Sequence, residues 1–337
     1  MKVVIAGGSG DLGALIAGAF SVMGHEVVIL SRRTSPPAAP GEPSATGVRF
    51  VSWDGRRLGD WAAEIDGAGI VVNLAGRTVN CRYSPKHRQE IVQSRVDSTR
   101  AIGEAIARAG RPPATWLQAA TATIYSHRYD APNDEDTGII PEHEAGVPET
   151  WNFSLGVARS WEQALAEAPT LFTRKVALRI SIVMSPQPGG AFDVMLGLVR
   201  RGLGGRAGDG RQYVSWIHQV DFLRAVLWVA AHPELSGAVN LASPGALPNA
   251  EFMRDLRRAW GIRFGLPAAR WMLEIGALFL RTETELVLKS RRVAPARLLE
   301  SGFTFQFPTW PAAAADLCAN HRAALGHCQK RQAQASS

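Results

Sequence analysis

The chain has 337 residues, of which 46% are hydrophobic and 20% are charged, and its formal net charge is +7. This composition is typical of a globular protein with a sizeable core, and it excludes a largely disordered chain. The basic residues are spread along the sequence and the three cysteines are scattered, so we expect no nucleic-acid partner, no disulfide framework and no metal site.

The ends and the apolar stretches predict a cytoplasmic protein without a membrane partner. The sequence opens directly on a strand pattern, MKVVIAGGSG, rather than on the basic and then hydrophobic segments of a signal peptide. The longest apolar stretch, residues 271–280, contains Glu274 and is far shorter than the roughly 20 residues that cross a bilayer. An odd number of cysteines fits a reducing compartment.

Short apolar strands alternate with helical patterns through the first half of the chain. The predicted strands are residues 2–6, 25–30, 48–53, 70–73, 116–120 and 175–182. The predicted helices are residues 12–23, 88–109 and 154–167, and residues 34–47 read as a solvated loop. This alternation predicts an α/β fold with a doubly wound parallel Rossmann sheet over residues 1–185.

The alternation stops near residue 186. A glycine-rich stretch to Gly210 is followed by SWIHQVDFLRAVLWVA, by VNLASPG and by a helix-rich end. Open α/β sheets bind ligands at the carboxyl edge of their strands. We therefore expect a smaller substrate lobe over that edge at residues 186–324, partly interleaved with the sheet, and a polar, frayed tail at residues 325–337.

A glycine motif, G-x-x-G-x-x-G, directly follows the first strand and opens the first helix. Its glycines permit a tight turn, close approach of a pyrophosphate and close helix packing, and the helix N-terminus faces the anion. The motif predicts a nicotinamide-dinucleotide site rather than a purely structural turn. The predicted cofactor-binding residues here are Gly7, Gly10, Asp11, Leu12 and Gly13.

The residues after the second strand indicate which dinucleotide is bound. NAD-preferring folds usually place an acid there, whereas this chain has Ser31, Arg32 and Arg33. Two guanidiniums and a hydroxyl suit a 2′-phosphate, which favours NADP(H) over NAD(H); the alternative is a solvated basic strand end. Asp54, after the third strand, is a candidate for the adenine amine or a plain turn aspartate.

With these residues placed, the chain resembles the extended short-chain dehydrogenase/reductase superfamily, and within it the NAD-dependent epimerase-like family with a DUF1731-type carboxyl-terminal region, here about residues 248–318. The resemblance spans nearly the whole chain. It is carried by ordered motifs that include GGSGDLG, NLAG, CRYSPKHRQEIVQSRVDST, TATIY, LGGRAGDGRQYVSWIH, VNLASP and KSRRVAPARLLESGFTF.

The resemblance implies further cofactor contacts. Leu74, Ala75 and Gly76 are expected to pass under the cofactor, and Val183 is expected to offer backbone beside the nicotinamide. Glu90 and Arg95 are expected to face the cofactor from the following helix. The alternative for this last pair is an exposed ion pair of little energetic consequence.

The catalytic Tyr-x-x-x-Lys pair of the wider superfamily is missing. Thr121 stands at the position of the family's Ser or Thr, but no tyrosine has a lysine four residues on, and the expected slots fall near Ser154 and Ala158. Proton transfer would then need a substitute. The candidates are Tyr125, Tyr83, Arg82 and His218, each of which has a structural alternative as a pocket wall, an anion anchor or a buried histidine.

We expect an NADP(H)-dependent oxidoreductase or epimerase-like enzyme that acts on a small carbonyl or hydroxyl substrate, with Thr121 and Tyr125 as the candidate catalytic residues. The missing pair keeps a second hypothesis open, a catalytically silent NADP(H)-binding redox sensor or regulatory protein. The sequence identifies neither the substrate nor the oligomeric state.

Overall fold

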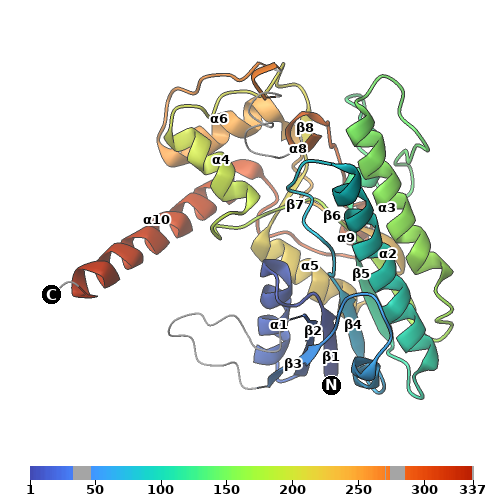
Figure 1. The fold of residues 1–337 in the computed structure, drawn as a ribbon. Helices are drawn as coiled ribbons and strands as arrows, with labels where there is room; N and C mark the ends of the chain where they lie inside the picture. The colour runs from blue at the N-terminus through green and yellow to red at the C-terminus, as the bar shows by residue number, and fades with distance from the viewer. Residues whose placement is uncertain (33–46, 270, 274–284, 336–337) are drawn as a thin grey trace. The chain divides into compact units, whose positions relative to one another are not determined.

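The computed structural model describes residues 1–32, 47–269, 271–273 and 285–335 (Figure 1). Its contacts divide the chain into two compact units. Unit 1 comprises residues 1–124, 140–180 and 223–240, and unit 2 comprises residues 125–139, 181–222 and 241–337. The chain passes from one unit to the other several times. The sequence analysis predicted partial interleaving, with one main boundary near residue 185.

A seven-stranded sheet organises unit 1, in the order β10-β6-β5-β4-β1-β2-β3. The strands are β1 (Lys2–Ala6), β2 (Glu26–Ser31), β3 (Val48–Ser52), β4 (Ile70–Asn73), β5 (Thr115–Thr121), β6 (Arg174–Ile180) and β10 (Gly237–Leu241). The pairs among β1 to β6 are parallel. The direction of winding reverses at β1, which lies between β2 and β4, so the predicted doubly wound α/β fold is confirmed.

Helices cover both faces of this sheet, because its strands are apolar on both sides. They are α1 (Asp11–Val22), α2 (Pro85–Arg108), α3 (Glu149–Glu167) and α5 (Gln219–Ala231), with short 3₁₀ helices η1 (Asp60–Glu64) and η2 (Ala122–Ile124). Val4, Val28 and Val71 pack with Ile102 of α2 and Leu165 of α3 in one buried cluster. Figure 1 shows α1 on the opposite side of the sheet from α2.

Arg174, at the start of β6, anchors a late segment of unit 1. Its Nη2 donates to the carbonyl oxygens of Val229 at 3.0 Å and Ala230 at 3.2 Å, and its Nη1 donates to that of His232 at 3.2 Å. A cation at the C-terminus of a helix satisfies terminal carbonyls and complements the helix dipole. Arg174 therefore fixes the end of α5 ahead of β10.

Unit 2 is built from short strands and helices around aromatic side chains. Its elements are β7 (Ile182–Met184), α4 (Ala191–Arg200), β8 (Tyr213–Val214), β9 (Trp216–His218), β11 (Leu247–Pro248), α6 (Asn249–Trp260), α8 (Glu285–Leu288), α9 (Ala296–Glu300) and α10 (Trp310–Ala335). Trp310 stacks on Phe252 with ring centroids 3.8 Å apart and meets Trp216 edge-on at 5.1 Å. These rings join α6, β9 and α10 in one core.

One expectation about elements is wrong. The strand predicted at residues 175–182 is two strands, because Ser181 leaves the ladder and donates its N–H and its hydroxyl to the carbonyl of Leu241, at 3.1 and 2.8 Å. The backbone of α10 is helical through Ala335, in the segment for which the sequence predicted a polar, frayed tail. Most of the predicted loop at residues 34–47 lies outside the described residues.

Within the described ranges, no helix combines the length and the apolar character that crossing a bilayer requires. The same part of the chain holds no cluster of three or more His, Cys, Asp or Glu side chains that could bind a metal ion.

Candidate functional site

Two of the three motif glycines are required by close backbone contact in unit 1. Gly7 has φ +78°, and a Cβ there would lie 2.8 Å from the backbone nitrogen of Ala75. A Cβ on Gly13 would lie 2.5 Å from the Cα of Gly8. Both distances exclude a side chain. Glycine at these two positions therefore allows the turn between β1 and α1 to pack closely on itself and on the segment after β4.

The middle glycine faces open space. A Cβ on Gly10 would meet only the carbonyl oxygen of Gly7, at 3.8 Å. Gly10 is the N-cap of α1, and no side chain caps this helix end. The first residues of the helix, Asp11 and Leu12, therefore present backbone N–H groups at an N-terminus with room for an anion. This arrangement fits the pyrophosphate of a dinucleotide.

The end of β2 is tied to the glycine turn through two hydroxyls. Ser31 is 6% exposed, and its Oγ donates to the Oγ of Ser9 at 3.2 Å. Arg32 is exposed at this point, and Arg33 lies outside the described residues. The predicted 2′-phosphate position is thus next to the turn expected to hold the pyrophosphate.

Asp54 is engaged in its own turn. Its Oδ1 accepts the backbone N–H groups of Arg56 at 2.8 Å and Arg57 at 3.0 Å. The N–H of Arg57, more than that of Arg56, holds the pKa of the carboxyl below its usual range. The geometry is that of a turn aspartate, and the adenine contact stays a prediction.

A buried amide pair fixes the Leu74-Ala75-Gly76 segment after β4. Asn73 Nδ2 donates to Gln118 Oε1 at 3.0 Å, and Asn73 Oδ1 accepts the N–H of Ala75 at the same distance. Both amides are essentially inaccessible to solvent. Because β4 and β5 are paired here, the segment leaves the carboxyl edge of the sheet in one fixed direction.

Arg95 of α2 lies against this segment, and the cofactor contact that the resemblance implies for it stays a prediction. Its Nη1 donates to the carbonyls of Arg77 at 3.0 Å and Ile91 at 3.1 Å, and its guanidinium carbon lies 5.0 Å from the ring centroid of Trp161. Burial lowers the pKa of Arg95 to about 10. A Cβ on Gly76 would lie 3.4 Å from the guanidinium carbon, so Arg95 packs directly against this segment.

Glu90 forms an ion pair with Arg77 rather than with Arg95. Both side chains of this pair are about one-third exposed, at 35% for Arg77 and 27% for Glu90. Glu90 therefore does not form the exposed ion pair with Arg95 that was the alternative to a cofactor contact. Whether Glu90 also contacts a cofactor stays a prediction.

The two residues predicted to be catalytic belong to different units. Thr121 ends β5 in unit 1, and its Oγ1 accepts the N–H of Thr123 at 3.2 Å. Tyr125 belongs to unit 2, is 2% exposed, and packs so closely on Gly138 that a Cβ there would lie 2.5 Å from its ring. Both assignments stay predictions.

The slots of the missing pair hold small side chains on α3. Ala158 is buried, and the Oγ of Ser154 donates to the phenolic oxygen of Tyr83 at 3.4 Å. Tyr83 comes from the loop before α2, and its ring meets that of Phe153 edge-on at 5.0 Å. The Tyr83 hydroxyl thus lies beside Ser154, the position near which the resemblance implies a tyrosine.

His218, another candidate, lies inside unit 2. Its Nδ1 accepts the N–H of Val220 at 3.2 Å, its Nε2 lies 3.2 Å from Asp316 Oδ2, and its ring lies 4.0 Å from that of Phe307. Burial lowers the pKa of His218, and the nearby Asp316 carboxylate opposes this effect. These contacts fit the structural alternative. Val183 lies on β7 of the same unit, opposite Ile217 of β9.

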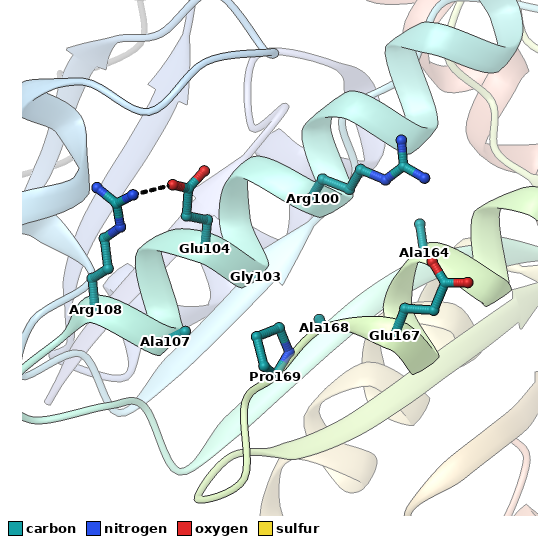
Figure 2. Close-up of a pocket in the computed structure, with 9 residues that line it drawn as sticks. All are labelled: Arg100, Gly103, Glu104, Ala107, Arg108, Ala164, Glu167, Ala168 and Pro169. Carbon is teal, nitrogen blue, oxygen red and sulfur yellow. Dashed lines mark hydrogen bonds and ion pairs between the residues drawn. The ribbon is translucent and has the colours of Figure 1, made fainter.

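A groove of about 350 Å³ lies between the C-terminal halves of α2 and α3 (Figure 2). Gly103 lets the helices approach closely, since a Cβ there would lie 2.8 Å from Ala168 and 3.4 Å from Trp116, near the start of β5. The groove is thus at the amino edge of the sheet. None of the predicted site residues lines it.

The sequence analysis missed the side chains that hold α2 to the segment after β4. Ser94 Oγ accepts the N–H of Arg77 at 3.0 Å, and Ser98 Oγ donates to the carbonyl of Ala75 at 3.5 Å. The signal was present as two hydroxyls four residues apart, on the helix face that also carries Arg95.

Family models and known proteins match the sequence over most of its length. The model of the NAD dependent epimerase/dehydratase family matches residues 3–242, and that of DUF1731, a domain of unknown function, matches residues 268–317. The human epimerase family protein SDR39U1 is 29% identical over 322 residues, 95% of this chain and all of that protein. The epimerase family protein Mb2239 of Mycobacterium bovis is 32% identical over 307 residues, 91% of this chain and 94% of that protein.

A solved structure is also similar to this chain. The crystal structure of human SDR39U1 (isoform 2) with NADPH has a TM-score of 0.79 and 28% sequence identity, and the match covers 95% of this chain and all of that one.

Proposed function

The chain belongs to the NAD dependent epimerase/dehydratase family, and on that premise we propose that it is an NADP(H)-dependent oxidoreductase of the epimerase-like type. Its substrate is a small molecule with a carbonyl or a hydroxyl group. The observation that carries the proposal is the open space at Gly10 beside the uncapped N-terminus of α1, between two glycines that backbone contacts require.

NADP(H) is favoured over NAD(H) by the end of β2. No acid stands there to bind a ribose 2′-hydroxyl; a buried serine tied to the glycine turn and an exposed arginine stand there instead. The related human protein with 28% identity was crystallised with NADPH, which supports the same choice. Location in the cytoplasm stays a prediction from the sequence.

The chain's own residues supply binding and orientation. Asp11 and Leu12 would hold the pyrophosphate through backbone N–H groups, and the Leu74-Ala75-Gly76 segment would contact the dinucleotide. Arg95 lies beside that segment. Thr121, at the carboxyl end of β5, orients a substrate oxygen. When bound, the nicotinamide supplies or accepts a hydride.

A second function is favoured by Ser154 and Ala158 in the catalytic slots, namely a silent NADP(H)-binding redox sensor or regulatory protein. One experiment separates the two. Titration calorimetry first measures binding of NADPH and NADH, and NADPH consumption is then followed with a panel of aldehydes, ketones and keto sugars. Tight NADPH binding with consumption supports the enzyme, binding without consumption supports the sensor, and absence of binding overturns both.

A further inference from the structure

We propose that Tyr83 is the proton-transferring residue of this protein, and that its hydroxyl replaces the tyrosine that α3 lacks. The inference rests on the proposed oxidoreductase function and deepens it. Its basis is the position of the Tyr83 hydroxyl beside Ser154, at the family's tyrosine slot, together with a cation from the neighbouring helix.

The position of the Tyr83 ring is fixed from two helices. Arg88 of α2 donates from Nε to the carbonyl of Tyr83 at 3.1 Å, and its guanidinium carbon lies 4.8 Å from the ring centroid of Phe153. Phe153 of α3 in turn contacts the Tyr83 ring. Ser154, the next residue, donates to the phenolic oxygen. Tyr83 is partly exposed, so its hydroxyl is held in place while the side chain keeps access to solvent.

Arg95 supplies the positive charge. In the described part of the chain its hydrogen bonds go to two backbone carbonyls and its ring contact is with Trp161, so these partners leave the charge uncompensated. Burial disfavours the cation, and the charge of Tyr83 favours it. Because a charge interaction is reciprocal, Arg95 stabilises the phenolate of Tyr83. In the superfamily's usual pair a lysine supplies this positive charge. In this chain Arg95 of α2 supplies it.

The proposed step transfers one proton and one hydride. In reduction, the O–H bond of Tyr83 breaks and its proton moves to the carbonyl oxygen of the substrate, while the carbonyl carbon receives a hydride from NADPH. The products are the alcohol, NADP⁺ and the Tyr83 phenolate, which regains a proton from solvent. In oxidation, the phenolate accepts the hydroxyl proton of the substrate as the hydride leaves.

The first test uses the free protein and needs no substrate. Tyrosinate absorbance is followed against pH for the wild type, Tyr83→Phe, Arg95→Met and Arg95→Lys. In the wild type we expect one phenolate to form at a lower pH than the others. This phenolate should be absent in Tyr83→Phe, should form at a higher pH in Arg95→Met, and should again form at the lower pH in Arg95→Lys. Tyr129→Phe is the control, because burial and the nearby Asp209 raise the pKa of Tyr129. Identical curves for the wild type and Tyr83→Phe overturn the inference.

The second test measures turnover with the carbonyl panel. Tyr83→Phe should lower kcat/KM by about 100-fold or more, the usual effect of losing a general acid, and should change the Kd for NADPH by less than about threefold. Tyr129→Phe should behave as the wild type. Turnover that survives in Tyr83→Phe removes Tyr83 and leaves the proposed function standing. A wild type that binds NADPH but reduces none of the carbonyls overturns the proposed activity itself.

Discussion

Glu162 of α3 and Arg179 of β6 form a two-point ion pair in unit 1, with Arg179 Nε donating to Oε1 and Nη2 donating to Oε2, each at 2.9 Å. Arg179 is 7% exposed and Glu162 is 19% exposed. A bidentate pair of this kind fixes the orientation of both planar groups, and its near-complete burial shields it from salt. The pair therefore locks α3 onto the sheet.

Glu162→Ala should strongly destabilise the protein. It leaves the buried Arg179 charge without its carboxylate, which costs about 3 to 5 kcal/mol in the free energy of unfolding. Urea unfolding followed by circular dichroism measures this change. Glu104→Ala, which removes the exposed partner of Arg108, is the control and should cost less than about 1 kcal/mol. Equal losses in the two variants would show that burial of the pair does not matter.

Gly10→Val should abolish dinucleotide binding and leave the fold intact. The structure has room for a side chain at Gly10, so the cost falls on the pyrophosphate that needs this space. Gly13→Ala, unlike Gly10→Val, should also lower the melting temperature, because its Cβ would collide with Gly8. Calorimetry and thermal unfolding of both variants measure the two effects. Unchanged affinity in Gly10→Val would contradict the cofactor site.

Replacing Arg32 and Arg33 with alanine should weaken NADPH much more than NADH. Each charge-assisted hydrogen bond to the 2′-phosphate contributes about 1.5 to 3 kcal/mol, so NADPH should bind roughly 10- to 1000-fold more weakly. Dissociation constants for both cofactors at low and moderate salt give the answer. Arg100→Ala, in the groove between α2 and α3, is the charge control. A preference that survives within about threefold would mark the two arginines as a solvated strand end.

Thr121→Val should reduce turnover without weakening NADPH binding, since its hydroxyl is assigned to the substrate. The same hydroxyl accepts the N–H of Thr123, so Thr121→Ser is the matched control that keeps the acceptor. We expect Thr121→Ser to keep most of the activity. Steady-state kinetics and NADPH titrations test both variants, and a fully active Thr121→Val would remove this residue from the site.

The thiol of Cys318 should make stability fall at high pH. Cys318 is fully buried, and burial raises its pKa to about 11. An unfolded thiol ionises near pH 8.5, so the unfolded state loses its proton first and stability declines as the pH rises from about 8.5 to 11. Unfolding in a Cys328→Ser background measures the decline. In that background a thiol reagent should modify Cys81 in the folded protein and Cys318 only after unfolding.

The sequence predicted the sheet well because the information for it is local. Runs such as KVVIA and IVVN are apolar on both faces, and glycines in a fixed pattern after a strand have few alternatives to a dinucleotide turn. The break at Ser181 was missed because it depends on a partner strand segment, Leu241, distant in sequence.

The catalytic part was harder to predict, since it depends on directions of side chains from separate helices. Nothing local shows that Tyr83 meets Ser154, which lies 71 residues later, or that Glu90 pairs with Arg77 rather than Arg95. Helical spacing places Glu90 and Arg95 on one helix, but the loop that precedes the helix decides which partner each one finds.

The hydrogen bonds from Arg174 to the end of α5 also limit where this chain can be cut into fragments that fold. The edge strand β10 and the carbonyls that Arg174 reaches come from residues 223–240, which follow a 42-residue excursion into unit 2. A fragment cut at residue 185 would carry six of the seven strands of the central sheet, and its Arg174 guanidinium would lose the carbonyl oxygens of Val229 and Ala230. Shuffling of modules between relatives, in evolution or in the laboratory, must therefore exchange both units together or move residues 223–240 with the first.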